Sequence, residues 1–354
     1  MKSFRHRFSA LLPIFCLVLL CACKRNGGRV LEVAYVSGVQ AILRDRVAAV
    51  YEKTGVVKNG DRVEVLDHDR RFVKVRTATG AMGWVEQRYL VGQEVFDRIQ
   101  KLTADNQNDS VQAQGTTRND TNLHVDPGRE TEHLYQISSG EKLLLLKRGT
   151  AEKAGTAPPP QRSAAASGNQ KDKEKDKGQE NKPAPVMEDW WLVRDSHNRV
   201  GWVLGRMIDL DVPLEVAQYA EGQRIVAYFV LNEVQDGDKK VAQYLTVLTE
   251  PKDGMPFDFN QIRVFTWNVR RHRYETAYRE RMEGVLPVMV GQENFDKEGV
   301  LPTFAIRVKD DTGNVSERKY KLNTPIVRRV LAPGEQPIHA SPKRTAGRNS
   351  RRKR

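Results

Sequence analysis

Short runs in which apolar and polar residues alternate cover much of the chain between residues 35 and 331. In residues 62–66, for example, two valines alternate with charged residues, and the turn sequence Asn59-Gly60-Asp61 comes just before them. Alternation with a period of two predicts strands that bury one face. One interval, 93–104, instead spaces its apolar residues as on one face of a helix. The pattern therefore predicts many short strands and one early helix.

The pattern of residues 35–92 returns in residues 121–211, which makes these intervals two divergent copies of one unit. Each copy has a turn made of glycine and an acidic residue, then a strand, then an aromatic strand, and it closes on Gly-Trp-Val. The matching segments are Asn59-Gly60-Asp61 with Ser139-Gly140-Glu141, Phe72-Val73 with Trp191-Leu192, and Gly83-Trp84-Val85 with Gly201-Trp202-Val203. Residues 93–120 are interpreted as a helix followed by a polar linker.

The second copy is interrupted by residues 149–186. This interval contains Pro158-Pro159-Pro160, a run of alanine, serine and glycine, and a run in which lysines alternate with acidic residues. Because it has almost nothing to bury, we predict that it is disordered. A long insertion at the tip of a hairpin is tolerable, since doubling the length of a loop costs only about 0.6 kcal/mol.

The order of these segments resembles bacterial Src-homology-3 (SH3) domains, above all in the closing Gly-Trp-Val of both copies. The opening motif differs from the usual Leu-Asn-Val-Arg-x-Gly, since the second copy has Leu123-His124-Val125-Asp126-Pro127-Gly128 and the first only Ala41-Ile42-Leu43-Arg44-Asp45. The resemblance implies two small SH3-like barrels in tandem, over residues 35–92 and 121–211, and a ligand among peptidoglycan peptides or envelope proteins.

Residues 214–331 have the spacing of a further small all-β domain, a sandwich or a barrel, with no family resemblance. A short helix is expected at 214–219. Strands are expected at 225–231, 244–248, 262–269, 274–279, 286–290, 304–309 and 319–322. The fold class predicted for the whole chain is therefore all-β, with two barrels followed by a third β domain.

The N-terminus has the pattern of an export signal, with basic residues followed by an apolar stretch too short to span a bilayer. Residues 1–22 are interpreted as this signal, and residues 23–34 as a tether. Leu20-Cys21-Ala22-Cys23 resembles the lipobox of bacterial lipoproteins, which implies cleavage before Cys23 and its lipidation. Lys24 after the lipid cysteine implies the periplasmic face of the outer membrane. The alternative is an ordinary signal peptide that ends in cysteine.

The formal net charge of +13 is concentrated at the two ends of the chain. Residues 343–354 alone carry seven Lys and Arg and no acidic residue, and residues 332–354 are predicted to be a disordered basic tail. The remaining parts are nearly neutral, so charge gives no reason to expect a nucleic-acid partner. All three cysteines lie within the first 23 residues, which excludes disulfides, thiolate metal sites and cysteine nucleophiles downstream.

The candidate ligand contacts are tryptophans. Trp84 and Trp202 are expected to fill the centres of their barrels, with stacking on a ligand as the alternative. Trp190 adds a second indole where the first copy has Arg71, and alternation turns it to the opposite, outer face, which makes it the better contact candidate. A basic and aromatic stretch, 270–281, is interpreted as a hairpin whose arginines pair with glutamates across strands, with the binding of phosphate or glycan carboxylates as the alternative.

The chain has no zinc-protease, nucleophile-elbow or phosphate-loop motif, and no catalytic residue, cofactor or metal is predicted. We expect a lipid-anchored, non-enzymatic binding protein of the cell envelope, held to the membrane through Cys23. The rival hypothesis is a scaffold or assembly subunit of an envelope complex, with residues 214–331 as its interface. An enzyme with unrecognised paired carboxylates is the third hypothesis.

Overall fold

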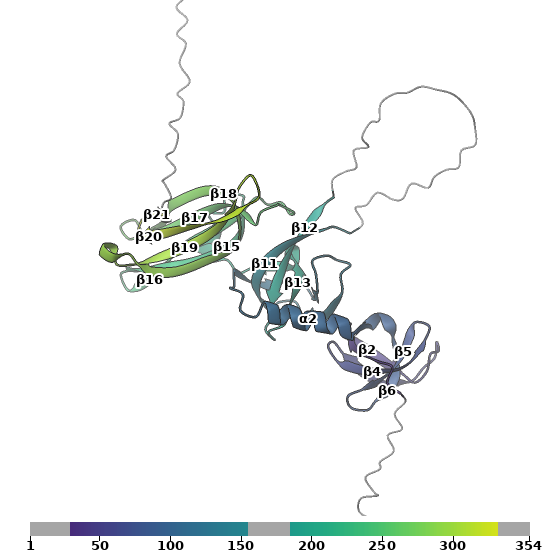
Figure 1. Cartoon of the computed structure of the whole chain (residues 1–354). Helices are drawn as coiled ribbons and strands as arrows, with labels where there is room; N and C mark the ends of the chain where they lie inside the picture. The colour runs from purple at the N-terminus through teal and green to yellow at the C-terminus, as the bar shows by residue number, and fades with distance from the viewer. Residues whose placement is uncertain (1–28, 155–184, 332–354) are drawn as a thin grey trace, which may run out of the picture. The chain divides into compact units, whose positions relative to one another are not determined.

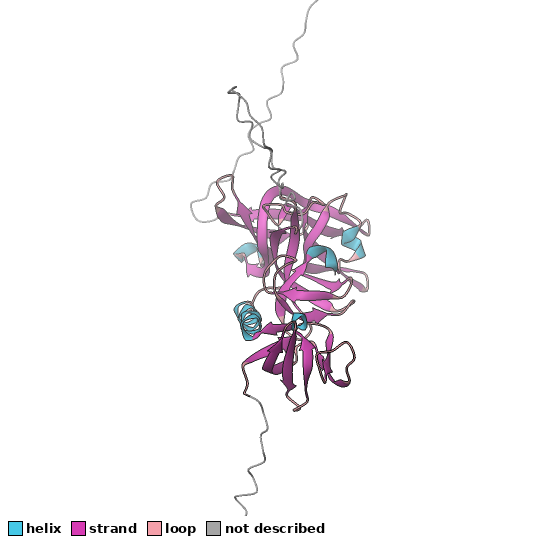
Figure 2. Ribbon diagram, turned by 90° about the vertical axis from the view of Figure 1, so that its right-hand side faces the viewer, coloured by secondary structure: helices cyan, strands magenta, loops and turns pink. Residues whose placement is uncertain are grey.

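The computed structural model describes residues 29–154 and 185–331, and strands make up most of them (Figures 1 and 2). They form three antiparallel sheets of seven strands each, so the predicted all-β fold class is confirmed. The chain divides into two compact units between Phe96 and Asp97. The signal peptide 1–22, Cys23, most of the interval 149–186 and the tail 332–354 lie outside the described residues.

The first sheet has the order β3-β2-β6-β5-β4-β1-β7. Its strands are β1 (Glu32–Val36), β2 (Gln40–Arg44), β3 (Lys53–Lys58), β4 (Arg62–Asp69), β5 (Phe72–Thr77), β6 (Met82–Glu86) and β7 (Leu90–Gly92), with the 3-10 helix η2 (Gln87–Tyr89) before the last. Its core consists of small and medium apolar residues, among them Val36, Leu43, Val63, Val75 and Val85. A sheet this small is filled by valines rather than by large aromatic rings.

Helix α2 (Gln93–Asp105) agrees with the helix predicted over 93–104. Val95 and Ile99, two of its predicted apolar positions, are buried. At its first turn the ring of Tyr35 stacks on Phe96 with centroids 4.2 Å apart, and the Tyr35 hydroxyl donates to Gln93 Oε1 at 3.0 Å. The start of the helix is thus attached to strand β1.

The second sheet has the order β10-β9-β13-β12-β11-β8-β14, which repeats the order of the first sheet strand for strand. Its strands are β8 (Ala113–Thr117), β9 (Thr121–His124), β10 (His133–Ile137), β11 (Lys142–Glu152), β12 (Met187–Arg194), β13 (Val200–Leu204) and β14 (Ile208–Leu210), with η3 (Gly205–Met207) in the place of η2. The correspondence extends to the glycines of the two Gly-Trp-Val segments. A Cβ at Gly83 would lie 2.7 Å from Leu43 Cβ, and one at Gly201 would lie 2.8 Å from Leu123 Cβ.

Two predicted boundaries of the second copy differ from the structure. Strand β8 lies in the interval 93–120, which was expected to hold only the helix and a linker. It was not predicted because its sequence is polar and shows no hydrophobic alternation. Backbone pairing with β11 and β14 holds the strand in the sheet, and the Thr117 hydroxyl donates to Ser138 O at 2.5 Å. Residues 149–152 pair with 187–190, so the β11–β12 hairpin extends into the interval 149–186.

The third sheet is a meander in which β15 to β21 are neighbours in chain order, after the short helix α3 (Leu214–Ala217). Its strands are β15 (Arg224–Asp236), β16 (Lys239–Thr249), β17 (Phe259–Asn268), β18 (Arg273–Asn294), β19 (Val300–Lys309), β20 (Val315–Asn323) and β21 (Ile326–Val330), with η4 (Asp296–Glu298) before β19. Strand β15 also contacts β18 and β19, so the sheet curls around its own core.

Two strand predictions in this domain fail for a local reason. The strands expected at 274–279 and 286–290 are one strand, β18, whose register against β19 shifts between Val285 and Met289 and so breaks the alternation. Strand β21 was not predicted, since its sequence mixes arginines with valines. It pairs with β20 at the end of the meander.

The second and third sheets share one hydrophobic core. Leu145 and Val193 of the second sheet belong to the same buried cluster as Phe304 and Tyr320 of the third. The backbone N–H of Val288 donates to Gln112 Oε1 at 2.7 Å across this junction. Residues 97–331 therefore behave as one compact unit. None of the helices within the described residues has the length and hydropathy that crossing a bilayer requires.

Candidate functional site

Trp84 lies on the face of the first sheet that is turned away from the core. On β6, Val85 is buried in the core, and alternation turns Trp84 to the opposite side. Trp84 is partly exposed and pairs in register with Lys74 on β5 and with Arg44 on β2. The expectation that Trp84 fills the centre of its barrel is therefore wrong, because the valines beside it already do so.

A stacked group of cationic and aromatic side chains lies next to Trp84. The Arg44 guanidinium lies 4.1 Å from the centroid of the Tyr51 ring and 5.0 Å from that of Phe72. It also forms an ion pair with Glu86 at 3.1 Å. Lys74 Nζ lies 6.0 Å from the Trp84 ring. Because the Arg44 charge already has these partners, Lys74 is the cation best placed to meet a ligand that stacks on Trp84.

Apolar side chains extend this surface along β2, β3 and β6. Ile42 and Val56 face each other across β2 and β3, and both are exposed, as is Met82 on β6. Alternation along each strand places all three on the side of Arg44 and Trp84. We call this set of exposed and partly exposed residues the Trp84 face. It consists of Ile42, Arg44, Val56, Lys74, Met82 and Trp84. Such a surface can hold an apolar or ring-shaped group flat and can pair with an anionic group at its edge.

Comparison with known proteins agrees with this part of the fold. Residues 41–91, from the second residue of β2 into β7, match the model of the bacterial SH3 domain family. These residues form a bacterial SH3 domain. No curated protein matches the chain.

Among solved structures, NlpC1 from Trichomonas vaginalis is similar to this chain at 8% identity and a TM-score of 0.18, over 84% of this chain and 91% of that one. An NlpC/P60 family protein from Bacillus cereus is similar at 9% identity and a TM-score of 0.23, over 86% and 96% of the two chains. TM-scores this low give no basis for transferring a function.

The second sheet lacks an equivalent of the Trp84 face. Trp202 pairs in register with Leu192 and His124, which replace the Lys74 and Arg44 of the SH3 domain. Its ring packs over Gly149, where an added Cβ would lie 2.8 Å from Trp202 Cζ3. It also packs against a small apolar cluster that includes Leu192. Trp202 is partly buried outside the main core, so here too the expected central position is wrong.

Trp190 is only 2% exposed, and its predicted outward exposure is wrong. Alternation does place it on the outer face, since Trp191 beside it lies in the core. The end of β9 and the segment that follows it cover that face. The His124 ring meets Trp190 edge-on at 5.2 Å, and Arg129 Nε donates to Glu188 Oε2 at 2.7 Å.

The strand register also corrects the alignment of the two copies by one residue. Lys74 opposes Trp84 in the SH3 domain, and Leu192 opposes Trp202 in the second sheet. Trp190 therefore corresponds to Phe72, and not Trp191 as the sequence match indicated. Each of the two side chains contacts the last residue of a corresponding strand. Arg44 of β2 lies over Phe72, and His124 of β9 lies against Trp190. A shift of one residue exchanges the two faces of a strand, which is why the prediction for Trp190 failed.

The two histidines of this region predict a dependence of stability on pH. Burial lowers the pKa of both His124 and His133, whose rings are 5.2 Å apart, and the nearby charge of His133 lowers that of His124 further. The unfolded chain then takes up protons more readily than the folded one below about pH 6.5. We expect the melting temperature to fall by a few degrees between pH 7.5 and pH 5, for a loss of about 1 kcal/mol.

Thermal unfolding followed by circular dichroism at both pH values measures this effect. The variant His133→Gln removes one titrating group and should reduce the difference. A melting temperature that is equal at pH 7.5 and pH 5 in the unchanged protein would contradict the prediction.

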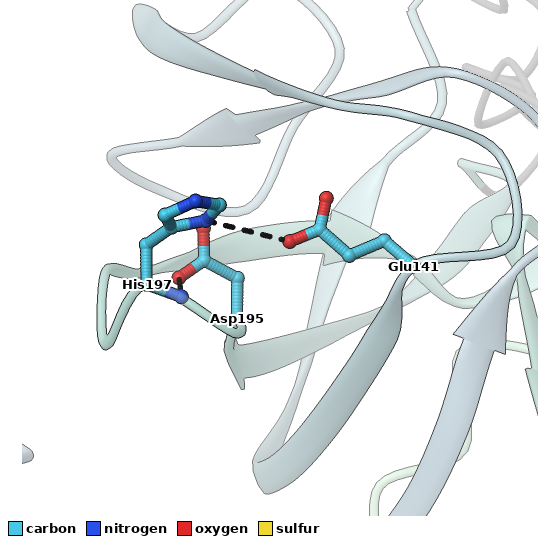
Figure 3. A group of neighbouring side chains, drawn as sticks. All are labelled: Glu141, Asp195 and His197. Carbon is cyan, nitrogen blue, oxygen red and sulfur yellow. Dashed lines mark hydrogen bonds and ion pairs between the residues drawn. The ribbon is translucent and has the colours of Figure 1, made fainter.

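Glu141, Asp195 and His197 bring three ligand-type atoms within 4.8 Å of one another, as Figure 3 shows. The contacts of Asp195 explain this grouping without a metal. One oxygen of Asp195 accepts from the backbone N–H groups of His197 and Arg199, both at 2.9 Å, and the other accepts from Arg199 Nε at 2.6 Å. Glu141 accepts from the Ser196 hydroxyl at 2.7 Å. These groups hold the turn between β12 and β13.

The basic stretch 270–281 consists of the turn after β17 and the first part of β18, so the expectation that its arginines pair with glutamates across strands of one hairpin is wrong. Arg271 and Arg273 both reach Glu275, at 3.1 and 3.3 Å. Arg279 pairs with Glu221 at 3.4 Å rather than with a glutamate of the hairpin. Most arginines of this stretch are therefore already paired with carboxylates of the protein, which speaks against the alternative interpretation that they bind the phosphate or carboxylate of a ligand.

Proposed function

We propose that this chain is a lipid-anchored, non-enzymatic binding protein of the bacterial cell envelope, and that its SH3 domain recognises peptidoglycan peptides through the Trp84 face. The match of residues 41–91 to bacterial SH3 domains is the observation that carries the proposal, since such a domain suggests a peptidoglycan-binding role. The partly exposed Trp84, with a lysine at its edge, supports it.

The chemistry of the Trp84 face suits such a peptide. The indole ring of Trp84 offers a flat apolar surface and an N–H donor. Lys74 lies where it can meet the free carboxylate at the end of a stem peptide. Ile42 and Met82 extend the apolar surface beyond the ring, which gives room for alanine-sized side chains. We assign Trp84 the stacking role and Lys74 the charge-pairing role.

We further propose that residues 113–210 are a second domain of the same kind with a different task. Its strand order is that of the SH3 domain, but the surface that corresponds to the Trp84 face is filled by the β11–β12 hairpin and by the end of β9 with the segment that follows it. It shares its core with the third sheet. Its role in this proposal is to support residues 214–331, and ligand binding is left to the SH3 domain.

The proposed anchor is a lipid on Cys23. An anchor at the membrane would raise the effective concentration of the SH3 domain at the cell wall without adding any contact. We expect Cys23→Ser to abolish incorporation of a clickable fatty acid in growing cells, and Cys21→Ser to leave incorporation intact. Label that persists in Cys23→Ser would contradict the lipid anchor.

Sedimentation with purified sacculi tests the binding function. We expect the full chain to sediment with sacculi and to release no muropeptides from them on prolonged incubation. If it stays in the supernatant and an envelope protein co-purifies with it, the competing scaffold function through residues 214–331 is favoured. Release of muropeptides would contradict the non-enzymatic part of the proposal.

A further inference from the structure

A cavity of about 270 Å³ lies at the junction of the second and third sheets. Four arginines line it, and two carboxylates, Asp189 and Asp253, lie in the same wall. The arginines are Arg118, Arg148, Arg206 and Arg224. So many guanidinium groups around a small enclosed space are unusual unless each of them has an anionic partner.

Ion pairs account for three of the four arginines. Asp189 binds both Arg148, at 2.5 Å, and Arg224, at 2.6 Å. Arg224 also reaches Asp253 at 2.7 Å. Asp258 and Asp209, which are not part of the wall, pair with Arg148 at 3.2 Å and with Arg118 at 2.5 Å. The carboxylates near the cavity are therefore already committed to arginines.

The Arg206 side chain makes no hydrogen bond or ion pair with any other residue that the structure describes. It belongs to η3, the short helix that follows Trp202 and leads into β14. Its side chain is exposed, but it contributes to the cavity wall. Glu188, on the neighbouring strand β12, forms its ion pair with Arg129, although the charge of Arg206 also helps to lower the pKa of Glu188. Arg206 therefore provides a cation that can bind a further anion.

Arg148 contributes a buried charge to the same wall. Its side chain is 5% exposed, and its two terminal nitrogens bind Asp189, Asp258 and the carbonyl of Phe257. Its Nε is buried and has no hydrogen-bond partner among the described residues. The donors of Arg148 are therefore either already bound or closed off from the cavity, and Arg206 is the arginine that remains for a ligand.

We propose that this cavity binds a small molecule that carries one oxyanion group, a phosphate or a carboxylate. The oxyanion accepts hydrogen bonds from Arg206, and the rest of the molecule packs against apolar residues of the wall, among them Trp191 and Ile208. The volume lies just below the range of about 300–1,000 Å³ that is typical of small-molecule sites, so the ligand is small. This site is separate from the Trp84 face and does not depend on the function proposed for it.

Isothermal titration of the purified full chain, with inorganic phosphate and with butyrate at constant ionic strength, tests the proposal. We expect saturable binding of at least one of the two, which also decides between phosphate and carboxylate. Arg206→Gln should weaken the binding about tenfold, since charge-assisted hydrogen bonds are the strong ones. Arg270→Gln is the matched control, because Arg270 is also exposed and no ion pair of its side chain is found among the described residues. This variant should bind like the unchanged protein.

Nuclear magnetic resonance of the tryptophan indole groups locates the ligand. We expect the Trp191 resonance, assigned with Trp191→Phe, to shift on addition of the anion and the Trp84 resonance to stay in place. The proposal is overturned if neither anion binds, if Arg270→Gln weakens the binding as much as Arg206→Gln does, or if Trp191 does not respond to a bound anion.

Discussion

Replacing Asp189 by asparagine is expected to lower the free energy of unfolding of residues 97–331 by about 3–5 kcal/mol, which is typical for removal of one partner of a buried ion pair. The carboxylate of Asp189 is buried and accepts three hydrogen bonds at once. The donors are Arg148 at 2.5 Å, Arg224 at 2.6 Å and the backbone N–H of Gly254 at 2.9 Å. Its loss leaves Arg148 charged and buried with only Asp258 and backbone carbonyls to bind.

Urea unfolding followed by tryptophan fluorescence measures this effect. The control is Asp209→Asn, which breaks the exposed pair with Arg118 and should leave the free energy of unfolding nearly unchanged, because solvent screens exposed ion pairs. The double variant Asp189→Asn with Arg148→Met removes both buried charges and should recover part of the loss. Equal effects of Asp189→Asn and Asp209→Asn would show that the junction does not depend on its buried ion pairs.

Replacing Trp84 by alanine is expected to weaken binding to sacculi by about 30-fold, the loss of about 2 kcal/mol that defines an aromatic hot spot. Stability should change by only about 1 kcal/mol, because the ring is partly exposed and is not part of the core of the SH3 domain. Sedimentation with sacculi measures the binding, and thermal unfolding of the same preparations measures the stability.

Two further variants separate stacking from folding. Trp202→Ala should keep the affinity for sacculi and lose stability, because that ring packs over Gly149 and a small apolar cluster. Trp84→Phe should keep much of the affinity, since it retains a flat ring. Unchanged binding by Trp84→Ala would remove the Trp84 face from the proposed function. If Trp84→Ala unfolded the SH3 domain, the ring would instead have the core role that the sequence predicted.

Local patterns were sufficient for much of the fold. The spacing of Val95 and Ile99 predicted helix α2, and alternation predicted most strands of the third sheet. Gly-Trp-Val revealed the repeat because a close approach of strands requires glycine at that point, at Gly83 against Leu43 and at Gly201 against Leu123. Strand β8 was missed, because a polar segment that is held by its backbone leaves no hydrophobic pattern.

The sequence by itself determined which side of a strand each residue occupies, wherever its register was read correctly. Whether that side is buried was decided by the tertiary structure. Trp84 and Trp190 both lie on outer faces, but the segment that carries His124 covers only Trp190. The arginine-lined cavity likewise joins Arg118, Arg148, Arg206 and Arg224, residues from four separate segments of the chain. Alternation is a property of neighbouring residues. Burial and charge pairing depend on contacts between segments far apart in sequence, and a local pattern does not predict those contacts.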